Sequence, residues 1–211
     1  MTLSVWLSLL PASVLISFTP GAGAINTMTN SLNEGFRRSI WGIIGQQVAL
    51  LIHIVIVAAG VGLVVAGSPV LFDSIRYAGA AYLVYLGVRM FTAPAEPTAA
   101  AGELPAETVV GEPAWSMIRR GIWVNLLNPK AVVFFLAFTP QFIRPGMPLL
   151  PQYAAFTATI VVVDVLVMWF FFAAAAKGFR RWTRSPRGAR ALNRVFGALF
   201  VLVALLLVFV E

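Results

Sequence analysis

Long apolar segments separated by short polar stretches dominate the pattern of this chain. A helix that crosses about 30 Å of hydrocarbon needs about 20 mostly apolar residues. Six segments meet or approach that length, and we expect the whole chain, 1–211, to form one transmembrane domain. The pattern therefore predicts an all-α membrane protein with six transmembrane helices. They span about residues 5–27, 40–65, 70–91, 118–143, 153–176 and 195–210.

Basic residues are distributed unevenly between these predicted helices. If the N-terminus is external, 12 of the 15 basic residues fall in the first, third and fifth loops. Arg76 and Arg144 lie on the other side, and Lys130 lies within the fourth helix. Because cytoplasmic loops carry the excess of Lys and Arg, the pattern predicts six spans with both termini outside. Asp73 is three residues from Arg76, and we expect the two to pair near the outer surface.

Composition narrows the class of protein. Hydrophobic residues make up 60% of the chain and charged residues only 11%, whereas a soluble domain is about one quarter charged. The net charge of +7 is explained by the basic loops, so a nucleic-acid partner is not expected. The third loop, 92–114, is rich in Ala, Pro and Glu and is predicted to be a flexible cytoplasmic connector.

Several kinds of chemistry have no residues to support them. The chain has no cysteine and one histidine, which argues against disulfides and against a metal site, and no cofactor is expected. It contains no GxxxxGK[ST] phosphate loop and no GxSxG or HExxH motif. We therefore expect neither ATP-driven pumping by this chain nor an enzyme, and active transport would draw on a solute or proton gradient.

Glycine and proline interrupt two of the predicted helices. The first helix contains Thr-Pro-Gly-Ala-Gly at 19–23, and the fourth contains Asn-Pro-Lys at 128–130. Each is the first helix of a three-helix half, and halves with an odd number of spans must be inverted relative to each other. Breaks at matching positions of two halves are typical of the binding site of a transporter. Unrelated proline kinks are the alternative interpretation.

Two charged residues and the single histidine lie deep in the predicted helices. At 1.5 Å per residue, Lys130 lies about 18 Å from the inner end of its span, His53 about 20 Å along helix two and Asp164 about 16 Å along helix five. All three fall near the midplane, where a charge usually marks a substrate or ion pathway. We expect Lys130 and Asp164 to pair, either as a structural salt bridge or as a site that exchanges partners with a zwitterionic solute. His53 is either a packing residue or a member of the pathway.

The motifs in these helices resemble those of the LysE/RhtB amino-acid exporters, over nearly the whole chain. The most specific match is Asn-Leu-Leu-Asn-Pro-Lys at 125–130, followed by Phe-Phe-Leu at 134–136 and Pro-Gln-Phe at 140–142. Further matches are Phe-Thr-Pro-Gly at 18–21, Gly-Ala-Ala-Tyr-Leu-Val-Tyr-Leu-Gly at 79–87, and His53 and Gly60 in the second helix. Ala22 replaces the second proline of the family's PGP motif, and Gly23 stands where a polar residue is often found.

The resemblance implies a secondary exporter of an amino acid or a close derivative, driven by proton motive force, in the bacterial inner membrane. The expected partners are this solute, protons and membrane lipid, and a homo-oligomer is compatible with the pattern. An exporter of another small solute, or a scaffold or sensor subunit, is the alternative. The family motifs and the depth argument together predict these pathway residues: Pro20, Gly21, His53, Asn125, Asn128, Pro129, Lys130 and Asp164.

Overall fold

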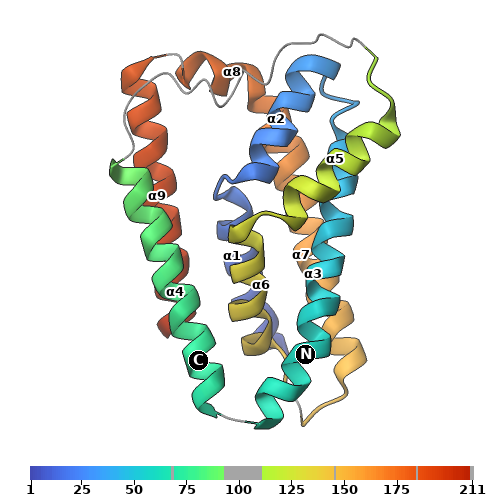
Figure 1. The fold of residues 1–211 in the computed structure, drawn as a ribbon, viewed down its shortest axis with the longest axis vertical. Coiled ribbons are helices and arrows are strands. Elements are labelled where there is room, and N and C mark those ends of the chain that lie inside the picture. Colours follow the sequence, from blue (N-terminus) through green and yellow to red (C-terminus); the bar gives the residue numbers. More distant parts are fainter. Residues whose placement is uncertain (68, 93–110, 145, 184, 210–211) are drawn as a thin grey trace.

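The computed structural model describes residues 1–67, 69–92, 111–144, 146–183 and 185–209. Within these ranges the chain forms helices and no strand, so the predicted all-α fold is confirmed. Most of the helices run along the long axis of the molecule, and α8 lies across one end (Figure 1). The helices are α1 (Leu3–Phe18), α2 (Ala22–Glu34), α3 (Ile40–Gly67), α4 (Pro69–Thr92), α5 (Ala114–Leu126), α6 (Pro129–Phe142), α7 (Leu149–Leu166), the π-helical segment η2 (Val167–Ala173), α8 (Ala174–Thr183) and α9 (Pro186–Phe209).

The first helix of each predicted half is broken, as expected. α1 and α2 meet at an angle of 58°, and α5 and α6 meet at 61°. Pro129 takes the first position of α6. The N–H group of a residue at this position has no partner within the helix, so a proline fits there without the loss of a helical hydrogen bond. From the two breaks, α2 and α6 run toward opposite ends of the molecule (Figure 1), which is the arrangement expected of inverted halves.

In the part of the chain that the structure describes, up to five segments have the length and apolar character of membrane spans. Three of them are single continuous segments, which lie within α3, across α7 to α8, and in α9. The other two are the bent pairs, if each pair is counted as one span. α4 is not among them, although its 24 residues extend about 36 Å at 1.5 Å per residue. The sixth span therefore stays a prediction that depends on α4.

Glycines allow two helix pairs to pack with their backbones in contact. A Cβ on Gly121 of α5 would lie 2.2 Å from the carbonyl oxygen of Gly42 in α3. A Cβ on Gly87 of α4 would lie 2.9 Å from the carbonyl oxygen of Gly197 in α9, and the reverse distance is also 2.9 Å. Close approach at small residues is the usual way in which membrane helices associate. α4 and α9 run side by side along one flank (Figure 1).

The structure corrects several predicted boundaries. Helix α2 continues to Glu34 instead of ending at residue 27, and α9 begins at Pro186 instead of residue 195. Residues 93–110 of the predicted third loop lie outside the described residues. The expected pair between Asp73 and Arg76 is wrong, because the Arg76 guanidinium donates to the carbonyl oxygens of Leu207 and Val208 near the end of α9.

Candidate functional site

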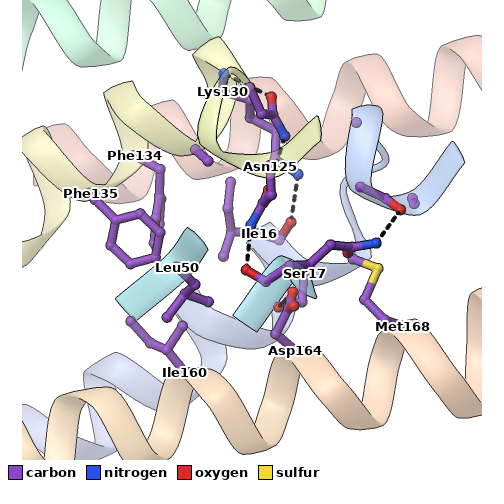
Figure 2. Close-up of a pocket in the computed structure, with 16 residues that line it drawn as sticks. Ile16, Ser17, Leu50, Asn125, Lys130, Phe134, Phe135, Ile160, Asp164 and Met168 are labelled. Carbon is purple, nitrogen blue, oxygen red and sulfur yellow. Dashed lines mark hydrogen bonds between the residues drawn. The ribbon is translucent and has the colours of Figure 1, made fainter. Parts of the chain in front are cut away.

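A cavity lies where the two broken helices meet (Figure 2). It encloses about 520 Å³ of space between protein atoms, part of which is open to solvent. The two breaks approach closely here, since a Cβ on Gly21 would lie 3.4 Å from the Asn128 side-chain nitrogen and 3.6 Å from Cδ of Lys130. The polar side chains that line the cavity are Ser17, Gln46, Asn125, Asn128, Lys130 and Asp164.

Lys130 lies in the first turn of α6, and its side chain reaches the end of α1. The Nζ atom donates to the carbonyl oxygen of Ile16 at 3.1 Å and to that of Thr19. Carbonyl groups in the last turn of a helix lack intrahelical donors and carry the negative end of the helix dipole, which favours a cation. Nζ also lies 5.9 Å from the centre of the Phe200 ring of α9.

Asp164 of α7 is held by two uncharged donors. The Ser17 hydroxyl donates to Oδ1 at 3.1 Å, and the Gln47 side-chain amide donates to Oδ2 at 2.7 Å. The predicted direct pair with Lys130 is therefore wrong, because both charges are already bound by other groups and form no ion pair with each other. Both nevertheless line the same cavity. Ser17 lines the cavity and Gln47 contacts Asp164, and neither was among the predicted pathway residues.

The amides around the second break form a connected set. Asn128 caps α6, because its side-chain oxygen accepts from the Lys130 backbone N–H at 3.1 Å. Asn125 donates to the backbone carbonyl of Gln46 at 3.0 Å. Gln46 in turn donates to the carbonyl of Gly23 at 3.1 Å and to the Thr27 hydroxyl at 3.0 Å. These bonds connect α5 and α3 to the start of α2, so the breaks are positioned by side chains from several helices.

The two predicted prolines shape the breaks and do not themselves line the cavity. Pro20 lies in the three-residue connection between α1 and α2, and Pro129 begins α6. Gly21, which precedes α2, does line the cavity, and its side-chain-free backbone leaves the start of α2 uncapped. The orphan N–H groups at such a helix start favour an anion.

His53, like Pro20 and Pro129, is a predicted pathway residue that does not line the cavity. It is buried in α3, and its ring stacks on Phe135 at a centroid distance of 5.8 Å with an interplanar angle of 11°. Phe135 does line the cavity, so His53 supports one wall of it. The Nδ1 atom of His53 is buried and has no hydrogen-bond partner.

The remaining wall of the cavity is apolar. Phe134 of α6, Ile160 of α7 and Met168 of η2 face it, together with Leu50 of α3. A site with a few polar groups and apolar walls is typical of small-molecule binding. Among the described residues, no group of three or more His, Cys, Asp or Glu side chains is arranged to hold a metal ion.

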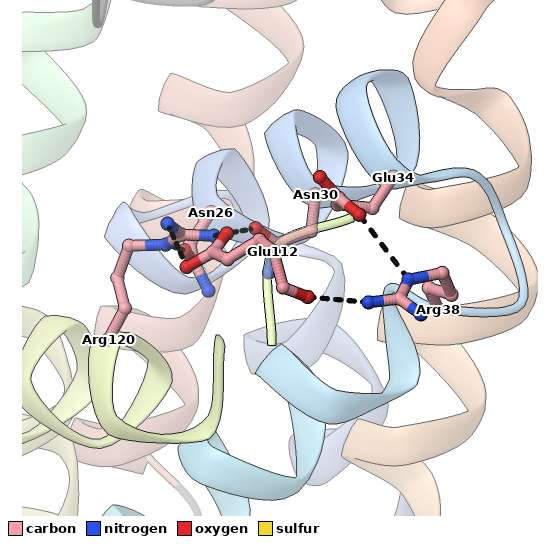
Figure 3. A network of polar contacts seen from close by, with 6 residues as sticks. All are labelled: Asn26, Asn30, Glu34, Arg38, Glu112 and Arg120. Atoms are coloured by element: carbon pink, nitrogen blue, oxygen red, sulfur yellow. Dashed lines mark hydrogen bonds and ion pairs between the residues drawn. The ribbon is translucent and has the colours of Figure 1, made fainter. Parts of the chain in front are cut away.

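A second polar cluster lies at the end of the bundle where α2 ends (Figure 3). The Arg120 guanidinium of α5 forms an ion pair with Glu112 at 2.7 Å and donates to the side-chain oxygens of Asn26 and Asn30 in α2 at 3.3 and 2.6 Å. Arg38 pairs with Glu34 at 3.3 Å in the same region. This cluster ties α5 to α2 at one end, away from the breaks.

The apolar helices and the two bent pairs, with a cavity at their breaks that polar side chains line, are the features of a multi-pass membrane protein. The sequence model of the LysE type translocator family matches residues 14–210, and the chain belongs to this family.

Three relatives, two of them efflux proteins, match nearly the whole chain. A homoserine/homoserine lactone efflux protein of Salmonella typhimurium is 41% identical over 208 residues, which cover 98% of this chain and 97% of the relative. A leucine efflux protein of Salmonella choleraesuis is 28% identical over 200 residues, covering 94% and 92%. An uncharacterized membrane protein of Vibrio cholerae is 38% identical over 209 residues, covering 98% of each chain. No solved structure matches the chain significantly.

Proposed function

We propose that this protein is a secondary exporter of an amino acid or a close derivative across the bacterial inner membrane. The observation that carries the proposal is the cavity at the two helix breaks, which Lys130 and Asp164 both line without pairing with each other. The efflux activities in the names of the relatives support the same class of solute. Homoserine-like solutes are the first candidates, because the relative of that name is 41% identical.

The chemistry of the cavity suits a zwitterion. A substrate carboxylate can accept from Lys130 Nζ and from the uncapped N–H groups at the start of α2. A substrate ammonium can donate to the Asp164 carboxylate, which receives only neutral donors in the structure. The apolar wall formed by Phe134, Ile160 and Met168 would then contact the substrate side chain and limit its size.

The remaining features of the proposal come from the charge pattern and from the family. The 211 residues act as one transport domain, and the distribution of basic residues puts both termini outside. The proton gradient as driving force is what membership of the exporter family implies. Pro20, Gly21, Asn125 and Asn128 shape and connect the breaks, and Pro129 sets the start of α6. His53 supports the wall through Phe135.

Export from whole cells tests the proposal. Bacterial cells that overproduce the protein are loaded with mixed dipeptides and with L-homoserine, and extracellular amino acids are followed by mass spectrometry. We expect one or a few amino acids to rise. Lys130→Ala should lower that export at least about tenfold, since a charge-assisted hydrogen bond is worth about 1.5–3 kcal/mol.

Lys177→Ala is the matched control, because this lysine is exposed on α8 and lies outside the cavity. It should export at the wild-type rate. No rise in any amino acid, with the protein present in the membrane, would contradict the proposed substrate class.

A further inference from the structure

The last turn of α1 contacts both charged groups of the cavity. The carbonyl oxygens of Ile16 and Thr19 accept from Lys130 Nζ. Between these two residues, the Ser17 hydroxyl donates to Asp164 at 3.1 Å. Figure 2 shows Ile16 and Ser17 between Lys130 and Asp164. One helix turn therefore offers acceptors to the cation and a donor to the anion.

This arrangement matches the two ends of a zwitterion, with oxygen acceptors at Lys130 and a hydrogen-bond donor at Asp164. The carbonyl oxygens stand where a substrate carboxylate would meet Lys130, and the Ser17 hydroxyl stands where a substrate ammonium would meet Asp164. We propose that the end of α1 with its C-cap, residues 16–19, holds the two charges in place of the substrate, and that an amino acid binds by displacing these residues. This inference rests on the proposed function and assigns Ser17 as a positioning residue.

When no substrate is bound, the charges of Lys130 and Asp164 need other partners in the membrane. A charged group withdrawn from bulk water is costly unless other groups donate to it or accept from it. Without the turn at 16–19, Lys130 would lose its two carbonyl partners and Asp164 would keep only the Gln47 amide. The turn thus lowers the cost of the substrate-free state, and the same contacts compete with the substrate.

The position of the turn couples binding to a change of helix geometry. Residues 16–19 come directly before the 58° bend between α1 and α2. Their contacts fasten the end of α1 to α6 through Lys130 and to α7 through Asp164. A ligand shifts a conformational equilibrium only by its different interactions with the two states. A substrate that replaces these contacts releases the end of α1 and favours a different bend.

Ser17→Ala tests the inference through the Michaelis constant of transport. Purified protein is reconstituted into liposomes, and counterflow of radiolabelled L-homoserine gives KM and Vmax. Because the variant loses a competitor of the substrate ammonium, we expect KM to fall about threefold to tenfold, the range for one hydrogen bond, without a rise in Vmax. A purely structural role for Ser17 would raise KM or leave it unchanged.

Ser13→Ala provides a matched control on the same helix. Ser13 is also buried, but its hydroxyl donates to the Leu9 carbonyl of its own helix at 2.8 Å, so KM should not change. Ser17→Thr keeps a hydroxyl and should retain the wild-type KM.

The outcomes separate the inference from the proposed function. No counterflow by the wild-type protein would overturn both. Wild-type counterflow with an unchanged or raised KM in Ser17→Ala would overturn only the inference. A lowered KM in Ser17→Thr as well would also overturn it, since the hydroxyl would then not be the competing group.

Discussion

At the scale of single residues, the surroundings of the Asp164 carboxylate allow its charge to be removed while its hydrogen bonds are kept. Ser17 and Gln47 donate to its two oxygens from different helices. The Gln47 amide oxygen is buried and has no partner. In Asp164→Asn, the new side-chain N–H group can meet that oxygen after the Gln47 amide turns over, so the hydrogen bonds can be rebuilt without the charge.

Asp164→Asn should therefore abolish most export while the protein remains folded. The neutral amide offers no counter-charge to a substrate ammonium, and we expect the export rate to fall at least about tenfold on loss of a charge-assisted bond. The melting temperature of the purified protein should not fall, because a charge that is costly in the membrane has been removed. Export at the wild-type rate would place the ammonium site elsewhere.

The residues that carry charge were predictable from the sequence, and their partners were not. A lysine and an aspartate are rare enough within apolar helices to stand out. Serine is common there and usually bonds its own helix, as Ser13 does. The contact from Ser17 to Asp164 depends on how α1 and α7 pack, which no local pattern encodes. The same holds for Lys130, whose partners are backbone carbonyls.

At the scale of helices, the contact between α3 and α5 depends on glycines that leave no space for a side chain. A Cβ on Gly45 would lie 2.0 Å from the carbonyl oxygen of Ile118, a backbone atom. Backbone atoms cannot turn aside as a flexible side chain can, so the two helices would have to separate. This pair links α5, the first part of one broken helix, to the unbroken α3.

Gly45→Ala should destabilise the protein by about 1–3 kcal/mol, the usual cost of overpacking. The melting temperature of the purified protein, followed by fluorescence, should fall by several degrees. Gly60→Ala makes the same change in the same helix, but a Cβ there meets nothing within 4 Å. That control should be as stable as the wild-type protein or more stable, because alanine favours a helix. Equal melting temperatures for the two variants would refute the tight packing at Gly45.

The sequence predicted that the first and fourth helices are broken, because proline and glycine act locally on the backbone. The ends of the helices were harder to predict. The polar residues that follow residue 27 and precede residue 195 continue as helix in α2 and α9, since a helix can extend beyond the apolar core where water satisfies its side chains. The π-helical segment η2 left no recognisable pattern of its own in the apolar run.

At the scale of the whole molecule, the charge pattern and the fold agree on one polarity. α8 and the start of α9 lie at one end, and the connection between α6 and α7 lies at the other (Figure 1). The end with α8 holds exposed basic residues such as Lys177 and Arg187, and the positive-inside rule predicts that such residues face the cytoplasm. The start of α1 and the end of α9 lie in the same half of the molecule (Figure 1). This agrees with the proposal that both termini are outside.

The absence of cysteine makes this orientation directly measurable, because any introduced thiol is the only one in the chain. A membrane-impermeant maleimide should label Met147→Cys in spheroplasts, since Met147 is exposed in the connection between α6 and α7. It should label Arg187→Cys only in inside-out vesicles. The reverse labelling pattern would show that the protein has the opposite orientation in the membrane, with the Arg120 cluster outside.

The same method decides whether α4 is the sixth span. Val70 and Thr92 are exposed residues near the two ends of α4, and 24 helical residues are long enough to cross about 30 Å of hydrocarbon. If α4 crosses the membrane, the maleimide labels Val70→Cys in spheroplasts and Thr92→Cys only in inside-out vesicles. Labelling of both from one side would leave five spans. The two termini would then lie on opposite sides, and the inverted three-helix halves would no longer describe the chain.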